Sequence, residues 1–191
     1  MKIKVLLIDN YDSFTYNLVQ LVQEVTGERP DVVRNDVLDS IELTDYSHVI
    51  LSPGPGIPDE AGFLKQTIGQ LANFKIPTLG VCLGQQAIAE QFGGSLTNLD
   101  KVYHGVSDKM HIVQQDSLFD QVPQNFEAAR YHSWIVNKAD LPDSLEVLCE
   151  GPKGEIMALR HKVLPILGVQ FHPESILTKD GKQIIQNFLT K

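Results

Sequence analysis

The segment PTLGVCLGQQ, from Pro77 to Gln86, gives the clearest indication of the fold. A short apolar run enters a tight turn, Cys82 lies at its apex, and a helix-forming segment follows. Residues 80–84 have the G-x-nucleophile-x-G spacing of a nucleophile elbow, with cysteine in the place of serine. Such a turn crowds the backbone, so that only residues without a β-carbon fit beside the apex. The stretch therefore predicts a strand, a sharp turn and a helix.

An elbow at Cys82 would also supply chemistry. The first free N–H groups of the following helix, beginning with that of Leu83, carry a partial positive charge that favours a thiolate and stabilises an oxyanion. The alternative is that Cys82 is a core thiol, because free cysteine is among the most buried residue types. The motif alone does not separate these two interpretations, and the rest of the chain has to do so.

The composition is that of an ordinary globular protein. Of the 191 residues, 42% are hydrophobic and 21% are charged, and the net charge of −8 argues against a nucleic-acid partner. Two cysteines are too few for a disulfide framework and form no C-x-x-C zinc pair, so we expect a cytoplasmic protein without a metal site. The first apolar run ends at Asp9, and no run is long enough to span a membrane, so no membrane partner is expected.

Alternating strands and helices predict an α/β fold. A helix capped by Ser13 and closed by Gly27 is expected, with another over residues 60–74. Right-handed crossovers would then give an open, mostly parallel sheet flanked by helices. A strand buried on both faces is expected at 5–8, and further strands are expected at 31–35, at 48–51 and in the apolar run that begins at Pro77 and enters the elbow.

The pattern changes after Ser95, where shorter strands are joined by polar turns. This half predicts a mixed or antiparallel extension of the sheet, followed by a helix over 179–189. No linker divides the chain, so residues 1–191 are expected to form a single domain. The expected strands are 101–115, 125–130, 144–150, 155–160 and 165–171.

Two further segments are candidates for the site. The loop SPGPGIP, residues 52–58, follows a buried strand, and ligands bind at the carboxyl edge of open α/β sheets. The alternative is a rigid surface turn. In GVQFHPES, residues 168–175, extended backbone would point His172 and Glu174 the same way, as a base and its orienting carboxylate. Surface strands also carry such pairs, but this one would complete a Cys-His-Glu triad.

The other histidines lack a repeated spacing. We interpret the side chains of His48, His104, His111 and His161 as structural or surface groups. His132, in the segment YHSW, is harder to assign because four side chains able to form hydrogen bonds follow one another after a strand. A buried polar corner is the alternative to a functional role for it.

Four separated segments resemble the signature blocks of the class I glutamine amidotransferases. They occur in the family's order and span nearly the whole chain. The opening DNYDSFTYNL, residues 9–18, is further similar to the glutaminase subunits of anthranilate synthase and aminodeoxychorismate synthase. The resemblance implies a flavodoxin-like class I amidotransferase fold. The four blocks are SPGPG (52–56), GVCLGQQ (80–86), RYHS (130–133) and GVQFHPES (168–175).

The resemblance also implies a role for each matching residue. Cys82 would be the nucleophile, His172 the base and Glu174 its orienting carboxylate. The N–H groups of Gly54 and Leu83 would form the oxyanion hole. Glutamine would be held by Gly54, Pro55, Gly56, Gln86 and the backbone of Ser133 and Trp134.

The implied activity is hydrolysis of L-glutamine to glutamate and ammonia. The ammonia would pass to a chorismate-binding synthase subunit that makes anthranilate, or alternatively 4-amino-4-deoxychorismate. This subunit would carry no cofactor, and the partner synthase would need Mg²⁺. We expect the docking surface for that partner to include the polar loop 10–13 and the rim at 53–58.

One position departs from the family. Gln85 stands where the family usually has histidine, and we expect it to alter packing more than chemistry. Gln85 is also the only support for a second hypothesis, a non-catalytic subunit that only binds a partner. A third hypothesis is a stand-alone cysteine hydrolase such as a γ-glutamyl peptidase, which would be fully active without a partner.

Overall fold

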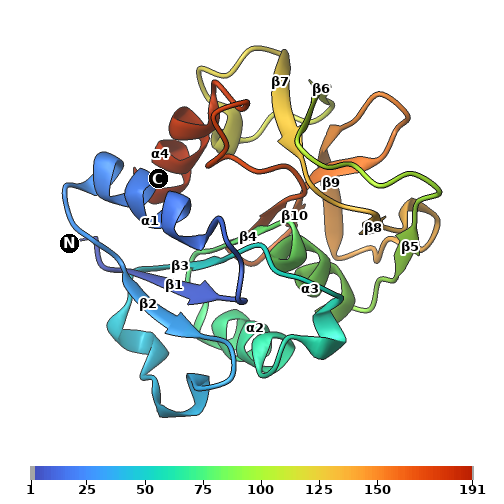
Figure 1. Cartoon of the computed structure of the whole chain (residues 1–191). Coiled ribbons are helices and arrows are strands. Elements are labelled where there is room, and N and C mark those ends of the chain that lie inside the picture. The colour runs from blue at the N-terminus through green and yellow to red at the C-terminus, as the bar shows by residue number, and fades with distance from the viewer. Residues whose placement is uncertain (1–2, 191) are drawn as a thin grey trace.

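The computed structural model describes residues 3–190, which build a nine-stranded sheet with helices on both faces (Figure 1). The first five strands in sheet order are mutually parallel, and every later neighbour is antiparallel. The expected mostly parallel sheet with an antiparallel extension is therefore confirmed. In sheet order the strands are β2 (Asp31–Arg34), β1 (Val5–Asp9), β3 (His48–Leu51), β4 (Thr78–Val81), β11 (Ile166–Val169), β10 (Ile156–His161), β9 (Leu145–Glu150), β6 (Val106–Ile112) and β7 (Asn125–Arg130).

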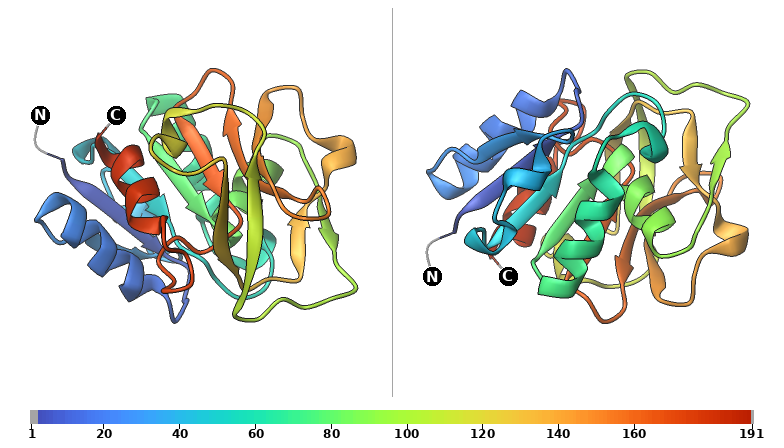
Figure 2. Two further views of the ribbon diagram at one scale, coloured as in Figure 1. Left: turned by 90° about the horizontal axis from the view of Figure 1, so that it is seen from above. Right: turned by 90° about the horizontal axis from the view of Figure 1, so that it is seen from below.

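The parallel strands form the centre of the core. Every residue of β1 and β4 is buried, as continuous apolar runs covered on both faces require. Helices α1 (Thr15–Thr26) and α4 (Gly181–Thr190) cover one face, and α2 (Leu64–Phe74) and α3 (Leu83–Gln91) cover the other (Figure 2). This arrangement brings the carboxyl ends of β3, β4 and β11 to one edge of the sheet.

Helix α1 begins differently from the prediction. Ser13 is not the N-cap; instead the carboxylate of Asp12 accepts a hydrogen bond from the Phe14 N–H at 2.7 Å, and that of Asp9 accepts one from the Thr15 hydroxyl at 2.7 Å. These two carboxylates satisfy groups at the start of the helix, a role that the prediction assigned to Ser13 alone. The end was predicted correctly, since Gly27 closes the helix with φ 78°.

The other helices also differ at their starts. The expected helix 60–74 divides into a short 3₁₀ turn, Pro58–Glu60, and α2 from Leu64. The C-terminal helix, expected over 179–189, begins at Gly181, and its Ile184, Ile185 and Phe188 are buried. Within residues 3–190, no helix has the length and apolar character needed to cross a membrane.

The antiparallel half was harder to predict. The expected strand 101–115 is regular only over β6, and a small second sheet of β5 (Leu96–Asn98) and β8 (Trp134–Val136) was missed. Both strands of that sheet are only three residues long, too short for a period-of-two pattern to be read. The β5–β8 pair lies beyond α3, at the periphery of the molecule (Figure 1).

Candidate active site

Cys82 occupies a strained elbow between β4 and α3. Its φ of 53° and ψ of −102° are rarely adopted by a residue with a side chain, and such strain costs about 1–3 kcal/mol. A β-carbon on Gly80 would lie 2.7 Å from the Gln85 nitrogen, and one on Gly84 would lie 2.7 Å from the Leu51 carbonyl oxygen. Both positions therefore need glycine, as the elbow motif predicts. Cys82 is nonetheless only 5% exposed, so the turn does not lift it clear of the core.

His172 and Glu174 form a buried pair. Nδ1 of His172 lies 2.6 Å from Oε1 of Glu174, and the two side chains are 2% and 0% exposed. The predicted reason for their contact was wrong. β11 ends at Val169, and residues 172–175 form a turn in which the Ser175 N–H donates to the His172 carbonyl at 3.2 Å. The turn, rather than strand alternation, brings the imidazole and the carboxylate together.

The electrostatics of His172 connect the pair to the elbow. Burial lowers its pKa, but interaction with the Cys82 sulfur and the Glu174 carboxylate outweighs burial and raises the pKa well above its ordinary value. Since Nδ1 is engaged by Glu174, Nε2 is the nitrogen left for proton transfer, and it has no hydrogen-bond partner among the described residues. The arrangement can hold a thiolate beside an imidazolium.

Two aromatic rings pack against the imidazole. The ring centroids of Tyr131 and Phe14 lie 4.9 Å and 5.6 Å from that of His172, and both contacts are edge-on. The two rings also contact each other at 4.9 Å. They restrict rotation of the imidazole. Neither residue was predicted to belong to the site, because Phe14 comes from the start of α1 and Tyr131 from the β7–β8 connection, which only the folded chain brings together.

The predicted oxyanion residues adjoin each other. A β-carbon on Gly54 would lie 2.6 Å from Cδ2 of Leu83 and 2.7 Å from the Asn10 carbonyl oxygen. Asn10 fixes this loop, since its backbone N–H and side-chain amide donate to the hydroxyl and the carbonyl of Ser52, both at 2.8 Å. Asn10 is 2% exposed, so its expected place on an exposed docking loop was wrong.

Of the residues predicted to bind glutamine, Gln86 and Trp134 contact each other, whereas Pro55 and Gly56 lie on a separate loop. Gln86 is buried, and its Nε2 donates to the Trp134 carbonyl at 2.8 Å. Ser133 and Trp134 are half-buried, and the Ser133 carbonyl accepts from the Leu99 N–H at 2.7 Å. Pro55 and Gly56 are exposed on the rim of the Gly54 loop.

His132 lies in a buried polar corner. Its Nε2 accepts a hydrogen bond from Nε of Arg130 at 3.2 Å, so its Nδ1 carries the proton and donates to the Trp134 carbonyl at 3.1 Å. Burial, with the Arg130 charge, lowers the pKa of His132 to about 3. His132 is therefore neutral at pH 7. Of the two interpretations that the sequence left open for this residue, its surroundings are those of the buried polar corner.

Gln85 is buried in the packing between α3 and the sheet. A β-carbon on Gly168 would lie 2.8 Å from its Cγ, and its Nε2 lies 3.4 Å from the Ile156 carbonyl oxygen. Its Oε1 has no hydrogen-bond partner within residues 3–190. The side chain of Gln85 therefore packs against β11 and β10 of the sheet.

A cavity of about 750 Å³ opens at the opposite end of the sheet from Cys82. Its lining includes the residues that precede or begin β3, β4 and β11, with the last turn of α4. None of the predicted site residues lines it. In the described part of the chain, no group of three or more His, Cys, Asp or Glu side chains could hold a metal ion.

Comparison with curated proteins finds relatives that share 44–48% of their residues with this chain. Aminodeoxychorismate/anthranilate synthase component 2 of Bacillus subtilis is 47% identical over 188 residues, covering 97% of this chain and 95% of that protein. Anthranilate synthase component 2 of Azospirillum brasilense is 48% identical, covering 96% and 94%. The bifunctional protein TrpGD of Thermotoga maritima is 44% identical, and this chain spans only 32% of its length.

Structure and family comparisons agree with each other. A crystal structure from Thermoplasma acidophilum, provisionally described as part of a GMP synthase, superposes with a TM-score of 0.87 at 26% identity, covering 99% of this chain and 93% of that one. The model of the family "Glutamine amidotransferase class-I" matches residues 6–191. From this match and the near-full-length relatives, it follows that the chain belongs to the class I glutamine amidotransferases.

Proposed function

We propose that this chain hydrolyses L-glutamine with a triad of Cys82, His172 and Glu174. The observation that carries the proposal is the 2.6 Å contact between His172 and Glu174, which leaves Nε2 of the imidazole to interact with the sulfur at the elbow. A nucleophile, a base and a group that orients the base make up such a triad, and the His172–Glu174 contact supports the last two roles. Family membership supports glutamine as the substrate.

In the proposed reaction, the Cys82 thiolate attacks the side-chain amide carbon of glutamine. The N–H groups of Gly54 and Leu83 stabilise the tetrahedral oxyanion, and loss of one such donor costs about 2.7–4 kcal/mol in barrier height. His172 protonates the leaving nitrogen, which departs as ammonia and leaves a glutamyl thioester on the sulfur. The imidazole then activates a water molecule that releases glutamate.

The substrate contacts follow the family pattern. Gly54, Pro55 and Gly56 form one wall of the proposed glutamine site, and Gln86 with the Ser133–Trp134 backbone forms the other. Gln86 is already oriented by the Trp134 carbonyl at 2.8 Å, which supports a preformed pocket on that side. Pro55 and Gly56 are exposed and leave an entry route.

We further propose that the ammonia passes to a chorismate-binding synthase subunit in a hetero-oligomer. The names of the relatives favour anthranilate as the product, in tryptophan biosynthesis. The Bacillus subtilis relative is named for both anthranilate and aminodeoxychorismate, so the second product is the alternative. The docking surface would include the exposed Tyr11 and the rim around Pro55.

The proposed mechanism also bears on whether this subunit needs a cofactor and on where in the cell it works. The mechanism uses only side chains and backbone N–H groups, so this subunit needs no cofactor, and the Mg²⁺ requirement belongs to the partner synthase. We propose the cytoplasm as its location, where the two cysteines remain thiols; both are free in the structure.

The test is glutaminase activity of the purified chain, measured alone and with each candidate synthase in the presence of chorismate. We expect weak activity alone and strong activation by one synthase, together with its aminated product. Cys82→Ser should abolish glutamine use but leave synthesis from added ammonium intact. Equal activity with and without a synthase would favour the peptidase hypothesis, and no turnover in any mixture would favour the non-catalytic subunit.

A further inference from the structure

A third buried glutamine, after Gln85 and Gln86, contacts the sulfur of Cys82. Gln170 follows β11, is 0% exposed, and its Nε2 lies 3.4 Å from Sγ. Its backbone N–H donates to the Met157 carbonyl at 2.9 Å, which fixes the start of the side chain. The amide group can only donate through nitrogen, so Gln170 directs an N–H at the sulfur.

Gln86 determines which way the Gln170 amide faces. Nε2 of Gln86 lies 3.2 Å from Oε1 of Gln170 and donates to it. The Gln170 oxygen is therefore occupied, and its nitrogen must face Cys82. The same Gln86 nitrogen donates to the Trp134 carbonyl at 2.8 Å, so both of its hydrogens are used. A flipped amide at either glutamine would place two donors or two acceptors face to face.

The Trp134 carbonyl is held from its other side by His132. Nδ1 of His132 donates to it at 3.1 Å, and Nε2 accepts from Arg130, which can only donate. A neutral imidazole fits both bonds, in agreement with its pKa of about 3, which burial and the Arg130 charge produce. The hydrogen bonds that lead from Arg130 to the Cys82 sulfur therefore each have a fixed donor and a fixed acceptor.

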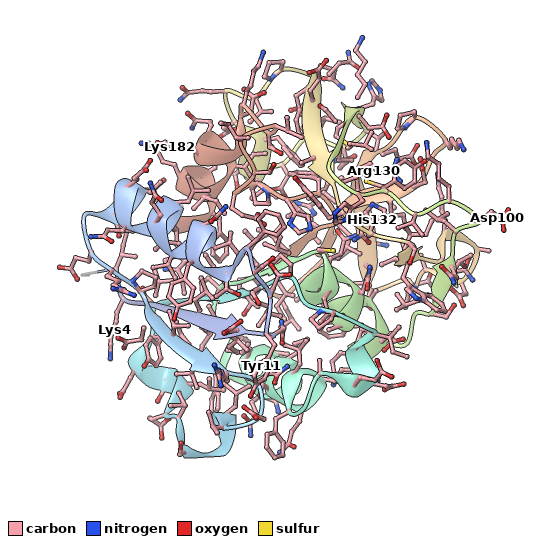
Figure 3. The ribbon with its side chains drawn as sticks, viewed as in Figure 1. Lys4, Tyr11, Asp100, Arg130, His132 and Lys182 are labelled. Carbon is pink, nitrogen blue, oxygen red and sulfur yellow. The ribbon has the colours of Figure 1, made fainter. Side chains whose placement is uncertain are left out.

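Arg130 anchors the series in the antiparallel half of the sheet. Its guanidinium is 0% exposed and contacts carboxylate oxygens of Glu155 and Asp108, both at 2.9 Å. The Tyr103 ring lies 3.6 Å from the guanidinium carbon. Figure 3 shows Arg130 and His132 beside each other in the interior, whereas Lys4, Asp100 and Lys182 lie at the periphery. A charge held on three sides is a rigid anchor.

We propose that Gln170 is a further catalytic residue, which donates a hydrogen bond to the Cys82 thiolate, and that Arg130 and His132 are positioning residues for Gln86 and Trp134. A hydrogen bond to a charged acceptor is stronger than one to a neutral acceptor, so the Gln170 N–H favours the thiolate over the thiol. The same contact holds Sγ in one position. This inference rests on the proposed role of Cys82 as nucleophile.

The first experiment measures alkylation of Cys82 by iodoacetamide at neutral pH, followed by mass spectrometry. This reaction needs a thiolate but no glutamine, so it is independent of the glutaminase assay. Cys149 does not interfere, because it is 0% exposed and burial raises its pKa to about 12. We expect Gln170→Leu to slow alkylation about tenfold, the effect of losing a hydrogen bond to a charged group.

The matched control is Gln85→Leu. Gln85 is also a glutamine that is 0% exposed, but its amide faces the Ile156 carbonyl and not the sulfur. We expect its alkylation rate to stay within about twofold of the unmodified chain. Circular dichroism and thermal melting verify that each variant is folded, and Gln170→Met replaces Gln170→Leu if the latter is not. Equal rates for the variants at 85 and 170 would overturn the role of Gln170.

The second experiment tests positioning by His132. His132→Asn keeps a donor near the place of Nδ1, whereas His132→Leu removes it. We expect His132→Leu to raise the KM for glutamine on the order of tenfold with a smaller change in kcat, and His132→Asn to restore most of the loss. A merely structural role would affect both variants equally, and that result would overturn this part of the proposal.

Discussion

The ends of β11 and β7 each carry a buried histidine, and the two have opposite chemistry. His172 follows β11, faces a carboxylate and a thiol, and has its pKa raised. His132 follows β7, faces a guanidinium, and has its pKa lowered to about 3. The two residues are 2% and 6% exposed, so burial is nearly equal. The charge of the neighbour, rather than a difference in burial, separates a histidine whose protonated form is favoured from one that stays neutral.

The largest expected effect comes from removing the neighbour that makes His172 basic. Glu174→Gln places an amide against Nδ1 and favours the wrong tautomer, so kcat/KM for glutamine should fall on the order of 10⁴-fold. Steady-state kinetics with the activating synthase measures it. Glu127→Gln removes an exposed carboxylate on β7 and should leave kcat/KM within about twofold. Similar kinetics for the two variants would remove Glu174 from the triad.

The next effect concerns the cation beside His132. Arg130→Met leaves the carboxylate of Glu155 buried without its partner, and breaking a buried pair costs about 3–5 kcal/mol of unfolding free energy. Adding Glu155→Leu removes the second charge and should recover at least half of the loss. Urea unfolding at pH 7 measures both variants. A double variant less stable than Arg130→Met would show that Glu155 has other essential contacts, such as the Lys153 N–H at 2.8 Å.

The smallest effect is the pH dependence of stability. For His132 the folded pKa, about 3, lies below the ordinary 6.5, so the unfolded chain binds the extra proton and stability falls as pH drops from 6.5 toward 3. For His172 the folded pKa lies above 6.5, so its contribution is present below pH 6.5 and is lost as pH rises through that higher pKa.

His132→Asn isolates the first of these contributions. Between pH 7.5 and 4.5, its unfolding free energy should decline by about 3 kcal/mol less than that of the unmodified chain. The comparison is of slopes, since the variant can differ in absolute stability. Parallel declines would mean that His132 is protonated in the folded protein.

The parallel half was predictable because its signals are local. The run at 78–81 with glycines at 80 and 84 describes a strand and an elbow within ten residues, and the structure has both. The antiparallel half was less predictable because its strands are paired by distant partners. β5 and β8 have three residues each, and their pairing depends on where the connection after β7 is held.

The candidate site divides in the same way. Cys82, His172 and Glu174 were named from their residue types and spacing, and the structure brings His172 and Glu174 to 2.6 Å. The predicted reason for this contact was wrong, since residues 172–175 form a turn after β11 instead of extended strand. Phe14, Tyr131 and Gln170 were not named as site residues, and Asn10 was expected only in the docking loop, because a single sequence does not show which distant side chains meet.

The residue pattern was enough to predict the parallel strands and the elbow, because apolar periodicity and glycine spacing act over a few residues. The family was recognisable from its four motif blocks, and the family match agrees. The charge of the two histidines, in contrast, depends on the folded structure. His132 and Arg130 are neighbours in the chain, but the carboxylates that hold Arg130 come from β6 and the segment before β10. A pKa depends on every charge within a few ångströms, and most of those charges reach the site from distant parts of the chain.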